Sequence, residues 1–266
     1  MSRSLPETAL SAAPVAGTRV VITGGGSGLG RAMADAFAAA GARIALCDAD
    51  PETLTGLPAG VLARPADVTD QEAMAAFLAE VDDAFGGVDV LCANAGTGGP
   101  AGPIETLDLE AWRACLSVNL DGAFLACHWA SARMKAAGSG LILITSSTAG
   151  LYGYPGRSPY ATAKWGLIGL MKTLAMELGP HGVRVNALCP GAVEGPRMDR
   201  VVAMEAAARG LPEAEIRDLY VRGVSMRSWV TAEEIAATAL WLASPAAARI
   251  SGQALAIDGH TETLAP

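Results

Sequence analysis

From residue 19 onward, short hydrophobic runs alternate with longer alanine-rich segments in which hydrophobic and polar positions are mixed. The short runs are almost continuously hydrophobic, which is typical of parallel strands covered by helices on both faces. They predict seven strands, at residues 19–23, 43–48, 61–66, 88–93, 140–146, 183–188 and 254–257. The segments between them predict helices over residues 28–40, 71–85, 109–137, 159–179 and 232–243.

This alternation of strand and helix predicts an α/β protein with a doubly wound parallel sheet. The 266 residues contain no internal repeat and no interior linker, so we expect one domain over residues 18–266, after a flexible leader over residues 1–17. The stretch 188–231 breaks the alternation and predicts helices at 198–208 and 212–222. We interpret residues 193–228 as a lid over a binding site, with a packed surface excursion as the alternative.

Composition and charge narrow the classes of protein. A hydrophobic content of 51% argues against intrinsic disorder, and a net charge of -8 argues against nucleic acid as the main partner. The leader lacks the apolar core of a signal peptide, and no apolar run reaches the roughly 18 residues that span a bilayer. The five cysteines are widely spaced, which favours reduced core thiols, no metal site and a cytoplasmic location.

A glycine-rich turn follows the first predicted strand and opens the first predicted helix. Glycines allow the backbone to approach a pyrophosphate closely, and a helix N-terminus presents N–H groups and partial positive charge. We therefore expect a phosphate-binding turn made by Gly24, Ser27, Gly28, Leu29 and Gly30. Gly also serves ordinary turns, so the position between strand and helix carries this interpretation.

Asp48 ends the second predicted strand, eighteen residues after Gly30. A carboxylate at this position accepts hydrogen bonds from ribose hydroxyls and repels a 2′-phosphate. The residue before Gly28 is Ser27 rather than Arg or Lys, so no cation is expected there for a 2′-phosphate. The sequence therefore favours NAD over NADP as cofactor, with Asp50 as a weaker candidate for the ribose contact.

Two further groups follow predicted strands, at the edge where open α/β sheets bind ligands. Asp67 is expected to hold the adenine amino group, and Val68 to pack on the ring. Asn94 either joins neighbouring strands or contacts the ligand, while the backbone of Ala95 and Gly96 is expected to line the cofactor.

Tyr160 and Lys164 lie four residues apart in a predicted helix, so their side chains share one face. Free tyrosine has a pKa near 10, and a neighbouring ammonium favours the phenolate. Ser147 follows the preceding strand and can hold a carbonyl or alcohol oxygen, and Asn119 can anchor a water that relays protons. Each residue alone is unremarkable, and only their combination with a dinucleotide-binding turn favours a functional role.

These motifs together resemble the short-chain dehydrogenase/reductase family over about residues 18–260. The matching elements are Thr23-Gly24-x-x-x-Gly28-x-Gly30, Asp67-Val68, Asn94-Ala95-Gly96, Asn119, Ser147, Tyr160-x-x-x-Lys164 and Pro190-Gly191. The resemblance implies a single-domain Rossmann fold with a seven-stranded sheet. It also implies a catalytic tetrad of Asn119, Ser147, Tyr160 and Lys164, and a homotetramer assembled through the long helices and the last strand.

The same resemblance implies that Tyr160 is the general acid/base and that Lys164 also holds the nicotinamide ribose. It implies further cofactor contacts from the backbone around Pro190, Gly191 and Val193. The family often has a threonine two residues after that valine, and this chain has Gly195 instead. The way in which the lid holds the nicotinamide end is therefore open.

We expect an NAD-dependent oxidoreductase that interconverts a secondary alcohol, such as a polyol, sugar or hydroxy acid, and its ketone. The alternatives are a 3-oxoacyl-thioester reductase, which Asp48 disfavours, and a non-catalytic dinucleotide-binding protein. Candidates to line a small-molecule pocket are Thr148, Tyr152, Tyr154 and Arg157, with Arg197 and Arg200 at the start of the lid. A cationic residue there would recognise a substrate carboxylate or phosphate, and solvated surface arginines are the alternative.

Overall fold

A computed structural model describes residues 16–263, without the side chains at positions 197 and 208; most of the expected leader therefore lies outside the described residues. Seven strands form one parallel sheet in the order β3-β2-β1-β4-β5-β6-β7. The strands are β1 (Arg19–Thr23), β2 (Arg43–Asp48), β3 (Leu62–Pro65), β4 (Val90–Ala93), β5 (Gly140–Thr145), β6 (Val183–Pro190) and β7 (Ala254–Ile257). The predicted doubly wound sheet is confirmed.

Eight α-helices connect these strands. They are α1 (Gly28–Ala39), α2 (Gln71–Phe85), α3 (Leu109–Leu116), α4 (Gly122–Ala137), α5 (Ser158–Leu178), α6 (Pro196–Arg209), α7 (Glu213–Arg222) and α8 (Ala232–Ala243). The helix expected over residues 109–137 is not continuous, because a π-helical turn at Ser117–Asp121 separates α3 from α4.

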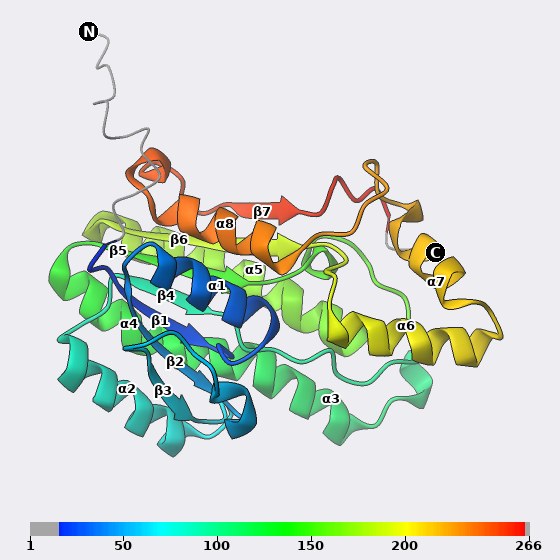
Figure 1. Ribbon diagram of the computed structural model, residues 1–266, viewed down its shortest axis with the longest axis horizontal. Helices are drawn as coiled ribbons and strands as arrows, with labels where there is room; N and C mark the ends of the chain where they lie inside the picture. The colour runs from blue at the N-terminus through cyan, green and yellow to red at the C-terminus, as the bar shows by residue number, and fades with distance from the viewer. Residues whose placement is uncertain (1–15, 264–266) are drawn as a thin grey trace, which may run out of the picture.

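The sheet is covered on both faces, as Figure 1 shows. Val20 and Ile22 of β1 pack into the layer formed by α1 and α8, whereas Val21 packs into the layer formed by α2, α4 and α5. Successive side chains of a strand point to opposite faces, so a continuously hydrophobic strand supplies both layers. This explains why the strand sequences do not alternate.

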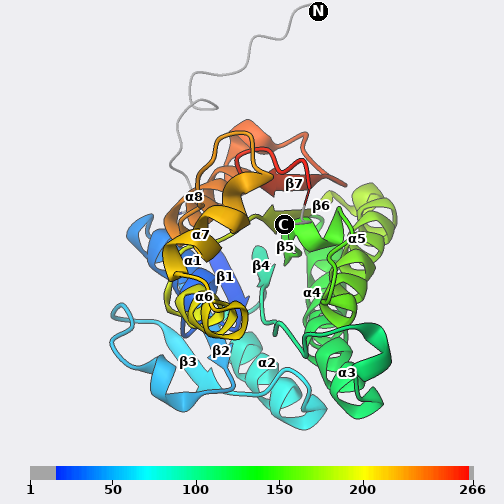
Figure 2. The same ribbon diagram turned by 90° about the vertical axis from the view of Figure 1, so that its right-hand side faces the viewer.

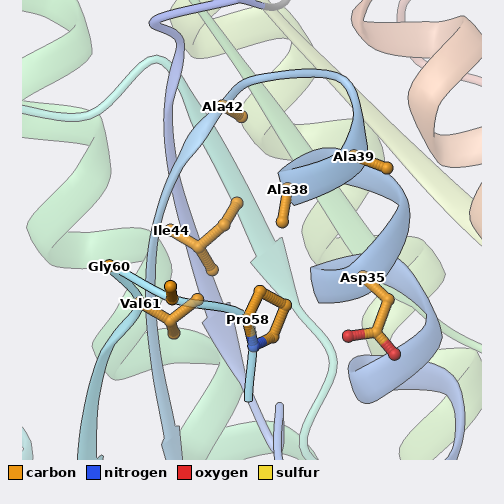
Figure 3. Close-up of a pocket in the computed structure, with 9 residues that line it drawn as sticks. Asp35, Ala38, Ala39, Ala42, Ile44, Pro58, Gly60 and Val61 are labelled. Carbon is orange, nitrogen blue, oxygen red and sulfur yellow. The ribbon is translucent and has the colours of Figure 1, made fainter.

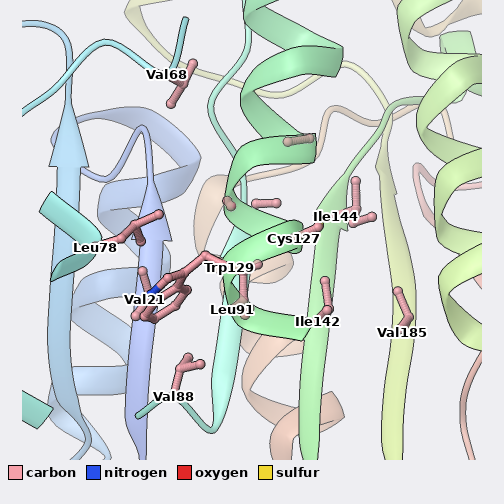
Figure 4. Packing of buried hydrophobic residues seen from close by; sticks show 14 of the residues in the cluster. Val21, Val68, Leu78, Val88, Leu91, Cys127, Trp129, Ile142, Ile144 and Val185 are labelled. Atoms are coloured by element: carbon pink, nitrogen blue, oxygen red, sulfur yellow. The ribbon is translucent and has the colours of Figure 1, made fainter. Parts of the chain in front are cut away.

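The layer beneath α2, α4 and α5 holds the larger cluster of buried side chains (Figure 4). Trp129 of α4 lies in it beside β1 and β4, and its indole N–H donates a hydrogen bond to Asp82 of α2 at 3.2 Å. Arg133 also binds Asp82, which lowers the pKa of that carboxyl group. These contacts fix α2 against α4.

Of the helices between residues 16 and 263, none combines the length and the hydropathy that a bilayer crossing needs.

The carboxyl ends of all seven strands point to one end of the molecule, where α6 and α7 lie (Figure 1). Figure 2 views this end, with α6 and α7 on one side of β4 and β5 and with α3 and α5 on the other. The order of the strands reverses between β1 and β4, which are direct neighbours. Ligands of open α/β sheets bind at such a reversal.

Candidate active site

The turn between β1 and α1 is packed so tightly that its glycines are required. A Cβ atom at Gly30 would lie 2.0 Å from the carbonyl oxygen of Gly24, and one at Gly24 would lie 2.9 Å from Cα of Ala95. The side chain of Ser27, at the N-cap of α1, makes no capping hydrogen bond. The first turn of α1 therefore presents main-chain N–H groups at the carboxyl edge of the sheet.

Asp48 lies directly beside this turn at the end of β2. Its Oδ2 atom accepts a hydrogen bond from the N–H of Gly26 at 3.0 Å, and its Oδ1 atom accepts one from the N–H of Asp50 at 3.2 Å. Asp50 itself caps the short helix Pro51–Leu54, accepting a hydrogen bond from the N–H of Glu52 at 3.0 Å. Asp48, rather than Asp50, is thus held at the glycine-rich turn.

Asp67 and Val68, which follow β3, lie in different environments. Asp67 is exposed, and its carboxylate accepts two hydrogen bonds from Thr69, each of 2.9 Å. Val68 is buried in the cluster beneath α2 and α4, and a Cβ atom at Gly122 would lie 2.6 Å from its side chain. The Val68 side chain therefore packs mainly on α4.

Asn94 uses its side chain to join three neighbouring strands. Its amide group donates to the carbonyl oxygens of Thr23 and Gly24 at 3.2 and 3.1 Å, and its Oδ1 atom accepts a hydrogen bond from Thr145 at 3.1 Å. The hydroxyl oxygen of Thr23 in turn accepts from the N–H groups of Asn94 and Ala95. Of the two interpretations of Asn94, this geometry supports the structural one.

Tyr160 and Lys164 share one side of α5, as their spacing predicts. The Lys164 side chain is 3% exposed, and its Nζ atom donates to the carbonyl oxygen of Thr145 at 2.9 Å. The same atom lies 5.5 Å from the centre of the Tyr160 ring. The ammonium group is therefore fixed between the end of β5 and the phenol.

Asn119 lies in the π-helical turn between α3 and α4 and is fully buried. Its amide group donates to the carbonyl oxygens of Thr97 and Cys115 at 3.0 and 2.9 Å. Its Oδ1 atom is buried and accepts no hydrogen bond from any of the described residues. A Cβ atom at Gly96 would lie 2.7 Å from this oxygen and 3.2 Å from Nζ of Lys164, so both polar groups converge on the backbone of Gly96.

Ser147 follows β5 and caps the short helix Thr148–Gly150. Its hydroxyl oxygen accepts a hydrogen bond from the N–H of Ala149 at 3.1 Å, which leaves the O–H able to donate. The neighbouring Ser146 donates to the main-chain carbonyl of Lys164 at 2.9 Å. Sequence reasoning missed the positioning roles of Thr145 and Ser146, because a main-chain acceptor and a strand-end serine have no distinctive pattern.

The segment after β6 passes the same edge of the sheet. Gly191 donates its N–H to Ile257 at 3.0 Å, and a Cβ atom at Gly191 would lie 2.8 Å from that of Asp258. Val193 pairs with Val230, which closes the base of the stretch that we interpret as a lid. Gly195 has a φ of +137°, a conformation that threonine rarely adopts. The backbone conformation at position 195 therefore favours glycine over the threonine that the family often has there.

Helices α6 and α7, within the stretch that we interpret as a lid, have a small core of their own, formed by Val202, Ala206 and Ile216. The phenol of Tyr220 on α7 donates to Glu205 on α6 at 2.9 Å. Tyr220 also interacts with Tyr154, whose pKa is raised by burial, an effect that the charge of Arg157 opposes. This contact joins the lid to the loop that precedes Tyr160, and sequence reasoning did not foresee the partners Glu205 and Tyr220.

Other features of the described chain lie outside this site. A hollow lined by the end of α1, the start of β2 and residues 58–61 lies at the amino ends of β2 and β3 (Figure 3), away from the Tyr160 side of the molecule. All five cysteines are buried, as expected of core thiols. Between residues 16 and 263 no three His, Cys, Asp or Glu side chains gather as metal ligands. Arg200 is exposed, and the side chain of Arg197 lies outside the described part.

Comparison with known proteins points to one family. Residues 24–260 match the family model described as "Enoyl-(Acyl carrier protein) reductase". The chain is 38% identical over 249 residues to D-beta-hydroxybutyrate dehydrogenase of Rhizobium meliloti, with 90% of this chain and 96% of that protein covered. It is 36% identical over 245 residues to cis-4-hydroxycyclohexanecarboxylate dehydrogenase of Sinomonas cyclohexanicum, covering 90% and 94%.

A solved structure shares the same architecture. The crystal structure of NAD⁺-bound xylitol dehydrogenase superposes with a TM-score of 0.87 at 29% sequence identity, covering 92% of this chain and 99% of that one. The agreement extends over nearly the whole sheet and its helices.

Proposed function

Because this chain belongs to the short-chain dehydrogenase/reductase family, we propose that it is an NAD-dependent oxidoreductase that interconverts a secondary alcohol and its ketone. The observation that carries the proposal is the convergence of Lys164 and Asn119 on Gly96, with Tyr160 on the same face of α5 as Lys164. The relatives with this fold are named as dehydrogenases of hydroxybutyrate, hydroxycyclohexanecarboxylate and xylitol. Their names leave both hydroxy acids and polyols as candidate substrates.

The residues of the glycine-rich turn fit a dinucleotide. The cradle between Gly24, Gly30 and Ala95 has no room for Cβ atoms, and α1 presents uncapped N–H groups there. We assign the cofactor site to Gly24, Ser27, Gly28, Leu29, Gly30, Asp48, Asp67, Val68, Asn94, Ala95, Gly96, Tyr160, Lys164, Pro190, Gly191 and Val193. Val68 and Asn94 would act through main-chain atoms, since their side chains pack within the protein.

Asp48 supports the choice of NAD. Its carboxylate, held by the N–H of Gly26, lies where ribose hydroxyls would donate to it. A 2′-phosphate at this position would meet a like charge. The arrangement therefore favours NAD over NADP.

In the proposed mechanism, Tyr160 is the general acid/base. Its phenolic oxygen takes the proton of the alcohol as the carbonyl forms, and returns a proton during ketone reduction. The ammonium of Lys164, anchored on Thr145, lies beside the Tyr160 ring, where it can interact with the phenol. The chemistry that bound NAD supplies is acceptance of the hydride that leaves the carbinol carbon.

Ser147 and Asn119 complete the proposed catalytic set. The O–H of Ser147 donates to the reacting oxygen, since its own oxygen already accepts from Ala149. The buried Oδ1 atom of Asn119 has no donor among the described residues, so it suits a water that passes protons to Lys164.

We also infer a cytoplasmic homotetramer with one Rossmann domain over residues 18–266. Phe124 on α4 and Trp165 and Met176 on α5 are 54%, 50% and 80% exposed. Trp165 and Met176 are eleven residues apart, so they lie on the same side of α5. Exposed apolar side chains on neighbouring helices are typical of a protein interface.

The experiment that tests the proposed function is an NADH-production screen. The purified chain is supplied with NAD and a panel of secondary alcohols, polyols and hydroxy acids, and absorbance of NADH is followed. Turnover of at least one secondary alcohol, with a ketone product identified by mass spectrometry, is the expected result. Reduction of 3-oxoacyl thioesters with NADPH in place of such turnover would favour the alternative reductase. Dinucleotide binding without any turnover would favour a non-catalytic protein.

A further inference from the structure

Arg157 lies at the N-cap of α5, three residues before Tyr160. Its guanidinium carbon is 5.9 Å from the centre of the Tyr160 ring and 5.9 Å from that of Tyr154. The main chain of Arg157 is held in place, because its N–H donates to the carbonyl of Tyr154 at 3.1 Å and its carbonyl accepts from Ala161 at 2.9 Å. A cation is thus held beside the proposed general acid/base.

This cation has no anionic partner in the described part of the chain. The Nε atom of Arg157 is buried and makes no hydrogen bond there. Each of the six arginine ion pairs found between residues 16 and 263 involves another arginine. A desolvated guanidinium N–H without an acceptor is costly, and the contacts with two aromatic rings compensate only part of that cost.

The charged groups around Arg157 do not supply that acceptor. Cys115 of α3 is buried, and burial raises the pKa of its thiol while Lys164 and Arg157 oppose the rise. Glu205 of α6, whose charge acts on Tyr154, already accepts from Tyr220 and forms an ion pair with Arg209 at 2.7 Å. Two cations, Arg157 and Lys164, lie against the Tyr160 ring.

We propose that Arg157 binds a carboxylate of the substrate, so that the secondary alcohol oxidised here is a hydroxy acid. This inference rests on the proposed function and narrows it, because a polyol or sugar would leave the guanidinium N–H unsatisfied. Arginine binds carboxylates through two parallel N–H···O hydrogen bonds, which would also orient the carbinol towards Tyr160. The position of Arg157 on α5 beside Tyr160 limits the substrate to a short carbon skeleton between the two groups.

The test compares keto acids with their uncharged methyl esters in the reductive direction, with NADH. The matched pairs are acetoacetate and methyl acetoacetate, and 4-oxocyclohexanecarboxylate and its methyl ester. Wild type is expected to prefer the acid of at least one pair. Arg157→Gln should lower kcat/KM for that acid roughly 10- to 100-fold and leave that for the ester within about threefold. Arg157→Lys, which keeps the charge, should recover part of the loss.

The matched control is Arg249→Gln, since Arg249 is an exposed arginine that precedes β7 at the opposite end of the strands. Arg249→Gln should leave kcat/KM unchanged for both acids and both esters. Circular dichroism with thermal melts would verify that each variant folds. An equal loss for acid and ester in Arg157→Gln would overturn the proposal, because it would assign Arg157 to the positioning of Tyr160. Equal kcat/KM of wild type for acid and ester in both pairs would also overturn the proposal.

A binding measurement separates this proposal from the proposed function. Cyclohexanecarboxylate and the uncharged cyclohexanecarboxamide are titrated calorimetrically into the protein saturated with NADH. The carboxylate should bind wild type at least about tenfold more tightly than the carboxamide, and Arg157→Gln should abolish that difference. If no ketone is reduced but the difference persists, the anion site stands and the proposed reaction fails. If wild type binds the carboxylate and the carboxamide equally tightly, Arg157 does not form an anion site, whether or not a ketone is reduced.

Discussion

The ammonium of Lys164 illustrates how single residues shape this site. It is almost fully buried, yet it is bound to the carbonyl oxygen of Thr145 and lies against the Tyr160 ring. A flexible lysine in solvent would spend little time in such a position, whereas here the end of β5 fixes it. The end of β5 thus holds the ammonium beside the phenol.

Asp48 gives a prediction about cofactor choice. Asp48→Ala removes the carboxylate that we propose accepts from the ribose and opposes a 2′-phosphate, so the expected preference for NAD over NADP should narrow roughly 10- to 100-fold. Steady-state kcat/KM with each dinucleotide measures this change. Equal efficiency of wild type with NAD and NADP would refute the assignment, and Asp50→Ala is the control that should change little, because Asp50 caps a local turn.

Asn94 gives a prediction about stability. Asn94→Ala removes three hydrogen bonds among β1, β4 and β5, and should lower the free energy of unfolding by about 2–4 kcal/mol. Urea unfolding followed by circular dichroism measures it. Thr145→Val removes only the hydrogen bond to Oδ1 of Asn94 and should lower the free energy of unfolding by about 1 kcal/mol. If Asn94→Ala unfolds like wild type but loses cofactor affinity, Asn94 is a ligand contact instead.

At the scale of elements, the strands and most helices could be predicted from hydrophobic patterning, since a buried parallel strand has few alternatives. The π-helical turn at Asn119 could not, because the segment from α3 to α4 reads as one continuous helical pattern and the interruption depends on contacts with Thr97 and Cys115. The choice between two roles for Asn94 likewise depended on how β1, β4 and β5 lie side by side.

If α6 and α7 form a lid, the contacts of Tyr220 lead to a prediction about substrate binding. Tyr220→Phe removes the hydroxyl that bonds Glu205 and interacts with Tyr154, which loosens α7 from the active-site loop. We expect KM for the alcohol to rise about 3- to 10-fold with little change in kcat. Steady-state kinetics checks this, and Arg209→Gln, which affects the ion pair of Glu205 but not the phenol, serves as control. A fall in kcat at unchanged KM would contradict the proposed role of the contact.

At the scale of the whole molecule, the reversal of strand order between β1 and β4 brings distant segments to one edge of the sheet. The glycine-rich turn follows β1, Gly96 follows β4, and Ser147 follows β5. The groups that we propose for dinucleotide binding and proton transfer therefore meet although they are far apart in sequence. The sequence predicted the local motifs. The convergence of Asn119 and Lys164 on Gly96 became visible only in the structure.

Assembly is tested at this scale as well. If α4 and α5 form an interface between copies, Trp165→Glu should convert the tetramer into smaller species, because a charge would be buried in an apolar contact. Size-exclusion chromatography with light scattering measures the mass. Met204→Glu replaces another exposed methionine, on α6, and should leave the mass unchanged. A monomeric wild-type protein would contradict the inferred tetramer.

The most direct test of the account is the Tyr160→Phe variant, assayed with the best alcohol from the screen and with NADH binding followed by fluorescence. Removal of one hydroxyl should lower kcat by about 100- to 10,000-fold, the usual contribution of general acid–base catalysis, and leave the Kd for NADH within about threefold. Turnover close to that of wild type at full cofactor occupancy would contradict the central claim that Tyr160 transfers the proton.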